Sequence, residues 1–315
     1  MKKATDLSRN ASYYVSVVVP AFNAGCYIKQ TILSILASSF RGFVVIVIND
    51  GSTDNTESEV RSISDERVIL VSQKNSGMSA SRNYGIDLVD SEFIALCDAD
   101  DLWHPRKLEL QIDLMPSNKD LGLCYTEFEN YYDGDDTHQF NDSSVSSEVD
   151  VTLSGYVYHK MLLTNWALPS SVIFRRSLWK RLGPFLCNDH QTDDWEYFVR
   201  ASLEFKFAKI KSSLVFYRQP PVSLSRKISV INSTELMRQS FIDKYGLVSP
   251  QGYECDFEQL KLRQYIGNKR FFDTQLSRGN FRVGFFGLIN IFFTDTRKWS
   301  TFVTLIKSLR RRFFG

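Results

Sequence analysis

Residues 92–101 read EFIALCDADD, in which five apolar residues run directly into three carboxylates. The apolar run, residues 93–97, predicts a strand that is buried on both faces, as in the centre of a parallel sheet. Asp98, Asp100 and Asp101 then lie where this strand leaves the sheet. Ligands of open α/β sheets bind outside the carboxyl ends of the strands, so the stretch predicts a ligand site.

Three neighbouring carboxylates repel one another unless a cation compensates their charge. A divalent metal with oxygen ligands, together with a phosphate-bearing substrate, accounts for all three acids. A structural alternative is that Asp101 caps the following helix, because Asp is a favoured N-cap residue. That alternative explains one acid. A second D-x-D at residues 133–135 follows no predicted strand, so we interpret it as a solvated loop.

Composition restricts the class of protein. The 315 residues are 43% hydrophobic, enough for a large folded core, and the net charge of +2 argues against a general nucleic-acid binder. The five cysteines are widely spaced without a C-x-x-C pair, so they indicate neither a disulfide framework nor a zinc site, and we expect a reducing cytoplasm. The longest uncharged apolar stretch, residues 283–294, is short of the roughly 20 residues of a membrane-spanning helix.

The first part of the chain alternates apolar runs with helical patterns. Strands are predicted over residues 15–19, 43–48, 67–71, 92–97 and 121–126, with helices between them. Right-handed crossovers would place the loops after the first four strands along one edge of a parallel sheet, which is the candidate site. Ser52 or Thr53 suits a helix N-cap, but this leaves Asp50 unexplained. Arg82, on the helix that follows Gly77, suits a bound anion or a solvated helix face equally well.

The second half has a mixed pattern. Helices are predicted over residues 157–164 and 177–182, strands over 171–174, 207–210 and 214–217, and helical structure after Ser225. A second acidic loop, residues 188–194, leads into a helix that bears Trp195. From the residues alone, Asp193 and Asp194 are best explained as stabilising the start of that helix through its dipole.

Five segments stand in order over residues 14–220: VSVVVPAFN, VIVINDGSTDNT, NSGMSASRNYG, FIALCDADD and TDDWEYFVRA. Together they resemble the family 2 glycosyltransferases of the GT-A fold. The resemblance implies an α/β, Rossmann-like, mainly parallel central sheet with flanking helices, followed here by a C-terminal helical extension. It also implies transfer of a sugar from a nucleotide donor, usually UDP-linked, with inversion at the anomeric carbon and with Mn²⁺ or Mg²⁺.

The same resemblance assigns roles to individual residues. Asp100 would ligate the metal, and Asp98 would contact the ribose or the donor sugar. Asp194 becomes the leading candidate for the base that deprotonates the acceptor, with Asp193 left to a cap or an acceptor contact and Trp195 as a sugar platform or core residue. The other residues implied to bind the nucleotide sugar are Pro20, Ala21, Asn23, Asp50 (to the uracil), Asn75 and Arg82.

The chain departs from the family pattern at three places. The first-loop aromatic residue, commonly Tyr, is Phe22. The pair Tyr217-Arg218 is followed by Gln219 and two prolines rather than leading to a histidine. The Q-x-x-R-W motif of processive synthases is absent, as are transmembrane segments. We therefore expect addition of a single sugar to a hydroxyl of a glycan or polyprenyl-linked acceptor in bacterial surface-polysaccharide assembly, such as capsule, exopolysaccharide or O-antigen.

Three other functions compete with this one. A nicotinamide-dependent dehydrogenase would carry G-x-G-x-x-G after the first strand, and a nucleotidyltransferase a glycine- and arginine-rich loop there; neither motif is present. A degenerate nucleotide-binding module that acts as a membrane-apposed partner protein remains the alternative.

The sequence predicts three regions of the chain: a tail over residues 1–12, a catalytic domain over 13–225 and a helical region over 226–315. Within the catalytic domain, 13–126 form the nucleotide-binding half and 127–225 the acceptor half.

The C-terminal residues 297–313 have the pattern of an amphipathic helix. Trp299, Phe302, Ile306 and Leu309 fall on one side, against six cations between Arg297 and Arg312. Such a helix can lie in an anionic membrane surface, but a helix docked on the protein explains the pattern nearly as well. The expected location is therefore the cytoplasm, or the cytoplasmic face of the inner membrane as a peripheral protein.

Overall fold

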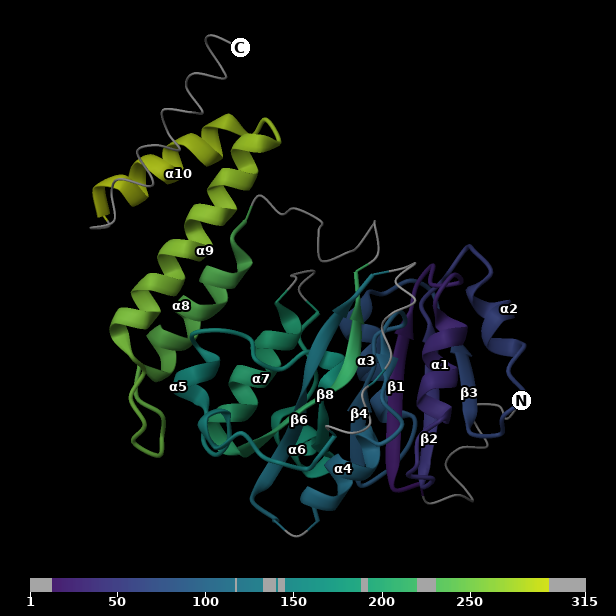
Figure 1. The fold of residues 1–315 in the computed structure, drawn as a ribbon. Helices are drawn as coiled ribbons and strands as arrows, with labels where there is room; N and C mark the ends of the chain where they lie inside the picture. Colours follow the sequence, from purple (N-terminus) through teal and green to yellow (C-terminus); the bar gives the residue numbers. More distant parts are fainter. Residues whose placement is uncertain are drawn as a thin grey trace. The chain divides into compact units, whose positions relative to one another are not determined.

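The computed structural model (Figure 1) describes residues 13–116, 118–132, 140, 145–187, 192–219 and 231–294. The chain forms two compact units, residues 1–161 with 165–223, and residues 162–164 with 224–315. The predicted tail over residues 1–12, the second D-x-D at 133–135, most of the acidic loop (188–191) and the amphipathic stretch 297–313 lie outside the described residues. The domain boundary predicted at residue 225 also falls outside them and stays a prediction.

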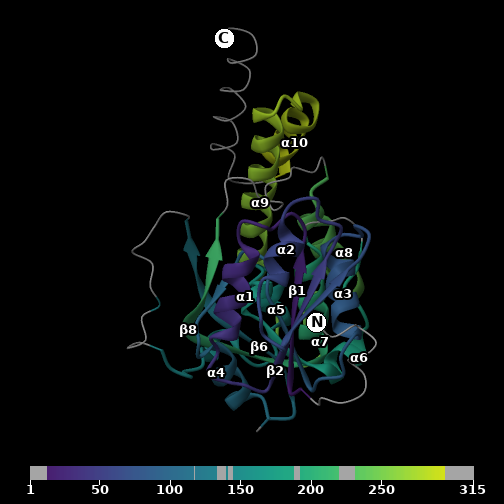
Figure 2. The same ribbon diagram turned by 90° about the vertical axis from the view of Figure 1, so that its right-hand side faces the viewer.

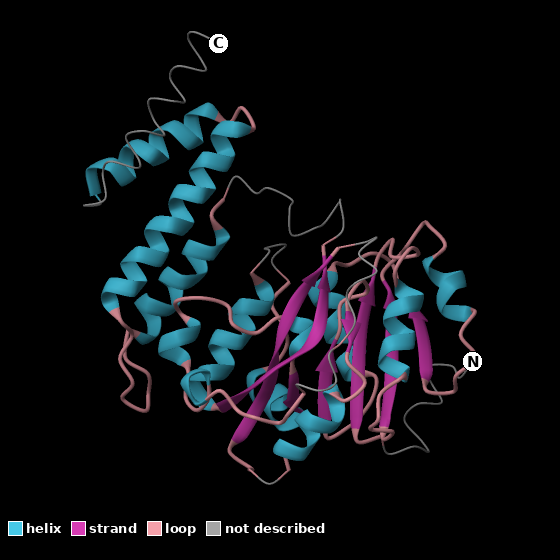
Figure 3. Ribbon diagram, viewed as in Figure 1, coloured by secondary structure: helices cyan, strands magenta, loops and turns pink. Residues whose placement is uncertain are grey.

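The first unit is built on an eight-stranded sheet of order β3-β2-β1-β4-β7-β6-β8-β5. Strands β3, β2, β1 and β4 run parallel to one another, as do β6 and β8, whereas β7 and β5 are antiparallel to their neighbours (Figure 3). The strand bounds are β1 Val15–Ala21, β2 Phe43–Asn49, β3 Val68–Ser72, β4 Phe93–Leu96, β5 Leu102–Trp103, β6 Leu121–Tyr131, β7 Ile173–Arg175 and β8 Lys206–Arg218.

Helices flank this sheet, and the second unit is helical in its described part. In Figure 2, α1 and α3 lie on opposite sides of β1. The helices of the first unit are α1 Ile28–Leu36, α2 Thr56–Arg61, α3 Met78–Asp87, α4 Lys107–Leu114, α5 Tyr158–Met161, α6 Arg176–Leu182 and α7 Asp193–Glu204, with short 3-10 turns at η3 Val151–Leu153 and η4 Pro169–Ser171. The helices of the second unit are α8 Ser233–Tyr245, α9 Phe257–Ser277 and α10 Phe281–Thr294. Among the described helices, none combines the length and apolarity that crossing a bilayer requires.

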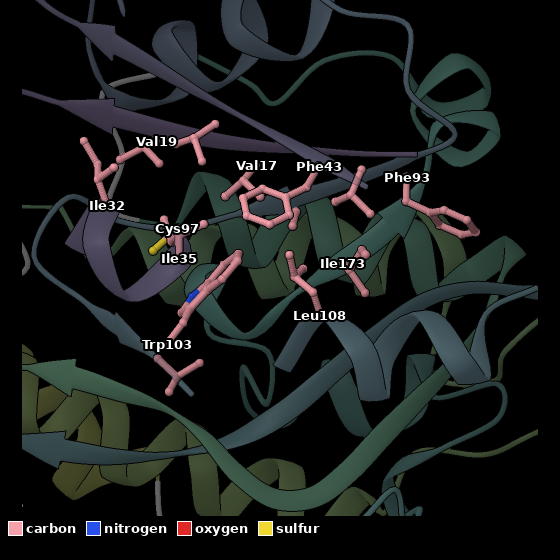
Figure 4. Packing of buried hydrophobic residues seen from close by; sticks show 14 of the residues in the cluster. Val17, Val19, Ile32, Ile35, Phe43, Phe93, Cys97, Trp103, Leu108 and Ile173 are labelled. Carbon is pink, nitrogen blue, oxygen red and sulfur yellow. The ribbon is translucent and has the colours of Figure 1, made fainter. Parts of the chain in front are cut away.

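The core explains why the central strands consist almost entirely of apolar residues. Every residue of β1 and β2 is buried, because helices cover both faces of the sheet. On one face Val17 and Val19 pack with Ile32 and Ile35 of α1 (Figure 4). On the other face α3 lies so close that a Cβ atom at Gly85 would stand 2.5 Å from Val18 Cγ1. This rigid sheet fixes the positions of the loops that follow its strands.

The second half of the sheet differs from the prediction. The antiparallel strand β7 separates β4 from β6, so the fourth and fifth predicted strands are not neighbours. Strand β5 was not predicted, since two residues are too few to show a period. The two strands predicted over 207–210 and 214–217 form one continuous strand, β8, and the helix predicted over 157–164 is reduced to α5. The helical character predicted after Ser225 is confirmed for the described residues.

Candidate functional site

The loops after β1 and β2 are tied together by Asn23. This residue has a φ of 50°, a left-handed conformation that Asn tolerates better than most side chains. Its backbone N–H donates to Ser52 Oγ at 3.0 Å, and its Oδ1 accepts from the Thr53 N–H at 2.8 Å. The N–H of Ala24 adds a bond to Thr56 Oγ1 at 2.8 Å. The predicted nucleotide-binding residue is therefore a structural clamp between two loops at the carboxyl edge of the sheet.

The predicted N-cap of α2 is wrong. The helix begins at Thr56, and its N-cap Asn55 makes no side-chain capping bond. Asp54 serves the first turn instead, because its Oδ1 accepts from the Thr56 N–H at 3.0 Å. The Ser52 hydroxyl is used by the loop that follows β1, as described above.

Asp50 organises the loop that leads into α3. It is buried, and its Oδ1 accepts from Gln73 Nε2 at 2.7 Å and from the Ser76 N–H at 2.8 Å. Its Oδ2 accepts from the Gly77 N–H at 2.9 Å, at a glycine whose φ is 90°. A carboxylate oxygen can accept about two hydrogen bonds, so Oδ2 retains capacity for one further donor. Asn75, at the tip of this loop, is exposed.

Two other residues predicted near the nucleotide lie at the buried end of β1. Pro20 lies inside β1, opposite Ile48 of β2, and Ala21 is the last residue of the strand. Both are buried. Phe22, which follows them, is 44% exposed and presents its ring at the edge of the sheet.

Arg82 and Asp98 form a buried ion pair beneath this edge. The Arg82 guanidinium is within 2.6 Å of Asp98 Oδ1, and its side chain is 4% exposed, so a solvated Arg82 is excluded. Burial alone would lower the pKa of Arg82, but Asp98 and the acidic pair 193–194 raise it above its ordinary value. Its Nε is buried and has no hydrogen-bond acceptor among the described residues. Arg82 is therefore the cation that compensates Asp98.

Asp101 is a structural residue of the acidic turn. Its Oδ1 accepts from the Arg218 N–H at 3.0 Å, and its Oδ2 accepts from the Ser170 hydroxyl, which itself accepts from the Asp98 N–H at 2.9 Å. Burial, with the negative charges of Asp98 and Asp100, raises the pKa of Asp101 well above its ordinary range. The N-cap alternative is wrong, because α4 begins at Lys107 with Arg106 as its N-cap.

Arg218, at the end of β8, holds the same turn from the other side. Its Nε donates to the Asp100 carbonyl at 2.7 Å, and a terminal nitrogen donates to Gln30 Oε1 at 2.9 Å. The guanidinium also stands 4.9 Å from the ring centroid of Tyr27 and 4.7 Å from that of Tyr131. Sequence reasoning did not predict this role of Arg218. The only indication of it in the sequence is that Arg218 stands at the end of a predicted strand.

The residues present fit a divalent cation held by one carboxylate. No group of three or more His, Cys, Asp or Glu side chains that could hold a metal occurs in the part of the chain that the structure describes. Mg²⁺ and similar cations at phosphate sites need one or two protein carboxylates, with substrate oxygens completing the shell. Asp100 is partly exposed and lies on a turn that Arg218 fixes through its carbonyl. It therefore offers a suitable ligand without a dedicated cluster.

The acidic pair at the start of α7 lies near Arg82 and Ser79 of α3, although it follows them by about a hundred residues in the chain. Asp193 Oδ2 accepts from Ser79 Oγ at 3.0 Å, and Asp194 Oδ1 accepts from the Trp195 N–H at 2.8 Å. Burial raises the pKa of Asp194 above its ordinary value, although the Arg82 cation and the Trp195 N–H act against it. The pair does occupy the first turn of a helix, as the dipole interpretation requires. It also lies within the electrostatic reach of Arg82 and Asp98.

Trp195 belongs to the core. It is 8% exposed, and its indole Nε1 donates to the Met161 carbonyl at 2.7 Å. Its ring therefore does not offer an open platform for a sugar. The sequence left these two roles open, and burial decides between them.

Comparisons with known proteins find relatives of this chain. A family model described as "Glycosyl transferase family 2" matches residues 16–181. An uncharacterised glycosyltransferase of Rickettsia typhi is 31% identical over 196 residues, which are 60% of this chain and 59% of that protein. The Escherichia coli UDP-Glc:alpha-D-GlcNAc-diphosphoundecaprenol beta-1,3-glucosyltransferase WfgD is 34% identical over 118 residues, 37% of this chain and 46% of that protein. The matched region thus spans less than two thirds of the length of these relatives.

A solved structure shares the fold. The crystal structure of S. aureus TarS 1-349 in complex with UDP-GlcNAc superposes with a TM-score of 0.58 at 18% identity, covering 94% of this chain and 80% of that chain. This likeness confirms the predicted α/β architecture of the GT-A type, with a curled central sheet and flanking helices.

Proposed function

Because the chain belongs to glycosyl transferase family 2 and has the GT-A fold, we propose that it transfers a single sugar from a UDP-sugar to a hydroxyl group of an acceptor glycan or polyprenyl-linked saccharide. The observation that carries the proposal is the buried Arg82, which pairs with Asp98 at the end of β4 and lies in the field of the acidic start of α7. The Arg82 cation thereby interacts both with the predicted donor-binding residue Asp98 and with the predicted base Asp194.

The donor would bind along the loops that follow the first four strands. Asp50 Oδ2 retains one acceptor position, which suits the N–H of a uracil ring. Asn23 and the exposed Asn75 border the same edge. The buried Nε of Arg82, for which the described part of the chain offers no acceptor, is able to donate to the nucleotide or its diphosphate. Ligands of parallel α/β sheets bind at such an edge. Proteins similar to this chain act on or bind UDP-sugars, by their names.

Asp100 would hold Mn²⁺ or Mg²⁺ against the diphosphate. The chemistry that such an ion supplies when bound is neutralisation of the charge on the leaving nucleoside diphosphate. The protein's own contribution is a rigid turn. Arg218 bonds to the Asp100 carbonyl and Ser170 to the Asp98 N–H, so the backbone of the turn that carries the Asp100 carboxylate is fixed before a ligand arrives.

Asp194 would act as the general base. Inversion requires one in-line displacement, hence one base on the acceptor side of the donor sugar and no enzyme nucleophile. A carboxyl whose pKa is raised by burial accepts a proton more readily than an exposed one. The Arg82 cation acts in the opposite direction and favours the ionised form of Asp194 that a general base requires. Asp193, bonded to Ser79, is then left to fix the start of α7 or to contact the acceptor.

The acceptor class is proposed from the relatives. WfgD is named for a sugar transfer onto GlcNAc-diphosphoundecaprenol, which supports a polyprenyl-linked acceptor and a place in bacterial surface-polysaccharide assembly. A lipid-linked acceptor would favour a peripheral position on the cytoplasmic face of the inner membrane. In the second unit, α10 exposes Phe286 and Val283, and the six cations beyond residue 296 follow it in the sequence.

The experiment is a transfer assay with the purified full chain. UDP release would be followed with UDP-glucose, UDP-GlcNAc and related donors, with Mn²⁺ or Mg²⁺, in the presence and absence of a GlcNAc-diphosphate lipid. We expect acceptor-dependent UDP release with one of these donors, and a product that carries one added sugar. Saturable UDP binding without release of UDP from any donor would instead support the degenerate nucleotide-binding module.

A further inference from the structure

One face of α3 contacts three other parts of the first unit. Ser79, Arg82 and Asn83 stand at helical spacing i, i+3 and i+4, so they share this face. Arg82 pairs with Asp98, and Ser79 donates to Asp193 Oδ2 at 3.0 Å. The proposed function assigns a task to Arg82 and leaves Asn83 without one.

Asn83 binds both backbone groups of a single residue. Its Nδ2 donates to the Phe185 carbonyl at 2.9 Å, and its Oδ1 accepts from the Phe185 N–H at 2.9 Å. A neutral side chain amide provides a donor and an acceptor at a fixed spacing, as a neighbouring strand does, and an aliphatic side chain or a carboxylate cannot replace both. Phe185 lies beyond the end of α6, in a segment without helix or strand. The side chain of Asn83 therefore provides the backbone hydrogen bonds that a neighbouring strand would otherwise provide to Phe185.

Phe185 in turn holds α7. Its ring is buried and stacks on Tyr197 with the ring centroids 4.0 Å apart and an interplanar angle of 27°. Tyr197 follows Asp193 by four residues and Asp194 by three, so all three belong to the first turns of the same helix. The position of Phe185 consequently limits where the start of α7 can lie.

We propose that Asn83 is a positioning residue, which fixes the start of α7 against α3 through Phe185 and so places Asp194 opposite the donor. This inference rests on the proposed function, in which Asp194 is the base. A displacement of a catalytic group by about 1 Å can cost on the order of 10²-fold in rate. Loss of the Asn83 bonds should therefore slow the chemical step while leaving the donor loops and the Arg82–Asp98 pair in place.

The test is a double-mutant cycle between Asn83→Ala and Asp194→Asn, measured as UDP release from UDP-glucose and UDP-GlcNAc with Mn²⁺ and a GlcNAc-diphosphate lipid. We expect Asn83→Ala to lower kcat by about 10- to 100-fold with the donor KM within about 2-fold. In the Asp194→Asn background, Asn83→Ala should cost less than about 2-fold more, because the group that it positions is already gone. Tyr84→Ala, an exposed change at the next position of α3, is the matched control and should retain wild-type kinetics.

A second variant covers the case in which Asn83→Ala does not fold. Asn83→Asp keeps the shape and the acceptor but replaces the donor to the Phe185 carbonyl, so it should also slow kcat. Equal losses from the Asn83 change in both backgrounds, or no loss in either, would overturn the inference while the proposed function stands. If Asp194→Asn leaves transfer unchanged, the assignment of Asp194 as base fails and this inference fails with it, while sugar transfer itself stands. If the wild type turns over no donor, the proposed function fails.

Discussion

Replacement of Arg82 by methionine should destabilise the first unit markedly. The Arg82–Asp98 pair has an N–O distance of 2.6 Å, with side chains 4% and 20% exposed. Removal of one member of a buried pair leaves an uncompensated charge and costs about 3–5 kcal/mol in the free energy of unfolding. For a unit of this size, each kcal/mol lowers the melting temperature by roughly 2–4 °C, so a fall of about 6–20 °C is expected for Arg82→Met.

The chain contains a control for this experiment. Arg61 and Glu57 also form an ion pair of 2.6 Å, but their side chains are 52% and 42% exposed. An exposed i,i+4 pair contributes at most about 0.5 kcal/mol, so Arg61→Met should shift the melting temperature by no more than about 2 °C. The melting temperatures would be measured by calorimetry at neutral pH without ligand.

The double variant Arg82→Met/Asp98→Asn sharpens the test. Removal of both members of the pair leaves no uncompensated charge at position 98, although Asp193 and Asp194 still lose the Arg82 cation. This variant should therefore recover part of the stability that Arg82→Met loses. The reasoning is refuted if Arg82→Met and Arg61→Met have equal effects, or if Asp98→Asn in the double variant brings no recovery. UDP binding should weaken in both Arg82 variants, because each lacks the guanidinium that we propose to contact the nucleotide.

Three further predictions concern the metal, the base and the membrane. Asp100→Asn, or a chelator added to the wild type, should abolish transfer while the melting curve is unchanged; equal activity with and without chelator would remove Asp100 as a metal ligand. Because the pKa of Asp194 is raised, kcat should fall as the pH drops through that raised value, where the base becomes protonated, and an acid limb at the ordinary Asp value of about 3.9 would argue against a buried base. A chain that ends near residue 295 should lose flotation with anionic vesicles relative to the full chain, and equal recovery of both would exclude the amphipathic stretch as the membrane contact.

The parallel half of the sheet was predictable because a strand that is buried on both faces requires apolar residues at nearly every position. The strands β1, β2 and β4 are apolar apart from Ser16 in β1 and the terminal Asn49 of β2, and each is followed by a loop that carries polar residues. The same pattern located Asp50, Asp98 and Asp100 at one edge. Predictions for this half were accordingly close, and the resemblance to a family added the assignment of roles.

Other parts of the site could not be inferred because their partners are distant in the chain. Asp101 is held by Ser170 and by Arg218, which lie 69 and 117 residues away in sequence. Local pattern offered a helix cap as the structural alternative for Asp101, since nothing nearby in the sequence shows that Asp101 is buried. The clamp of Asn83 on Phe185 likewise spans 102 residues. Such contacts depend on the tertiary fold and produce no periodic pattern in the sequence.

The most direct test of the account is a comparison of acceptor-dependent UDP release by the wild type and by Asp194→Asn at saturating donor. If Asp194 is the base, the rate of UDP release should fall by about 10²- to 10⁴-fold in Asp194→Asn, with the Kd for UDP nearly unchanged. Asp193→Asn should have a milder effect on the same rate. A rate that Asp194→Asn leaves unaltered would contradict the account, and a larger effect of Asp193→Asn would move the base by one residue.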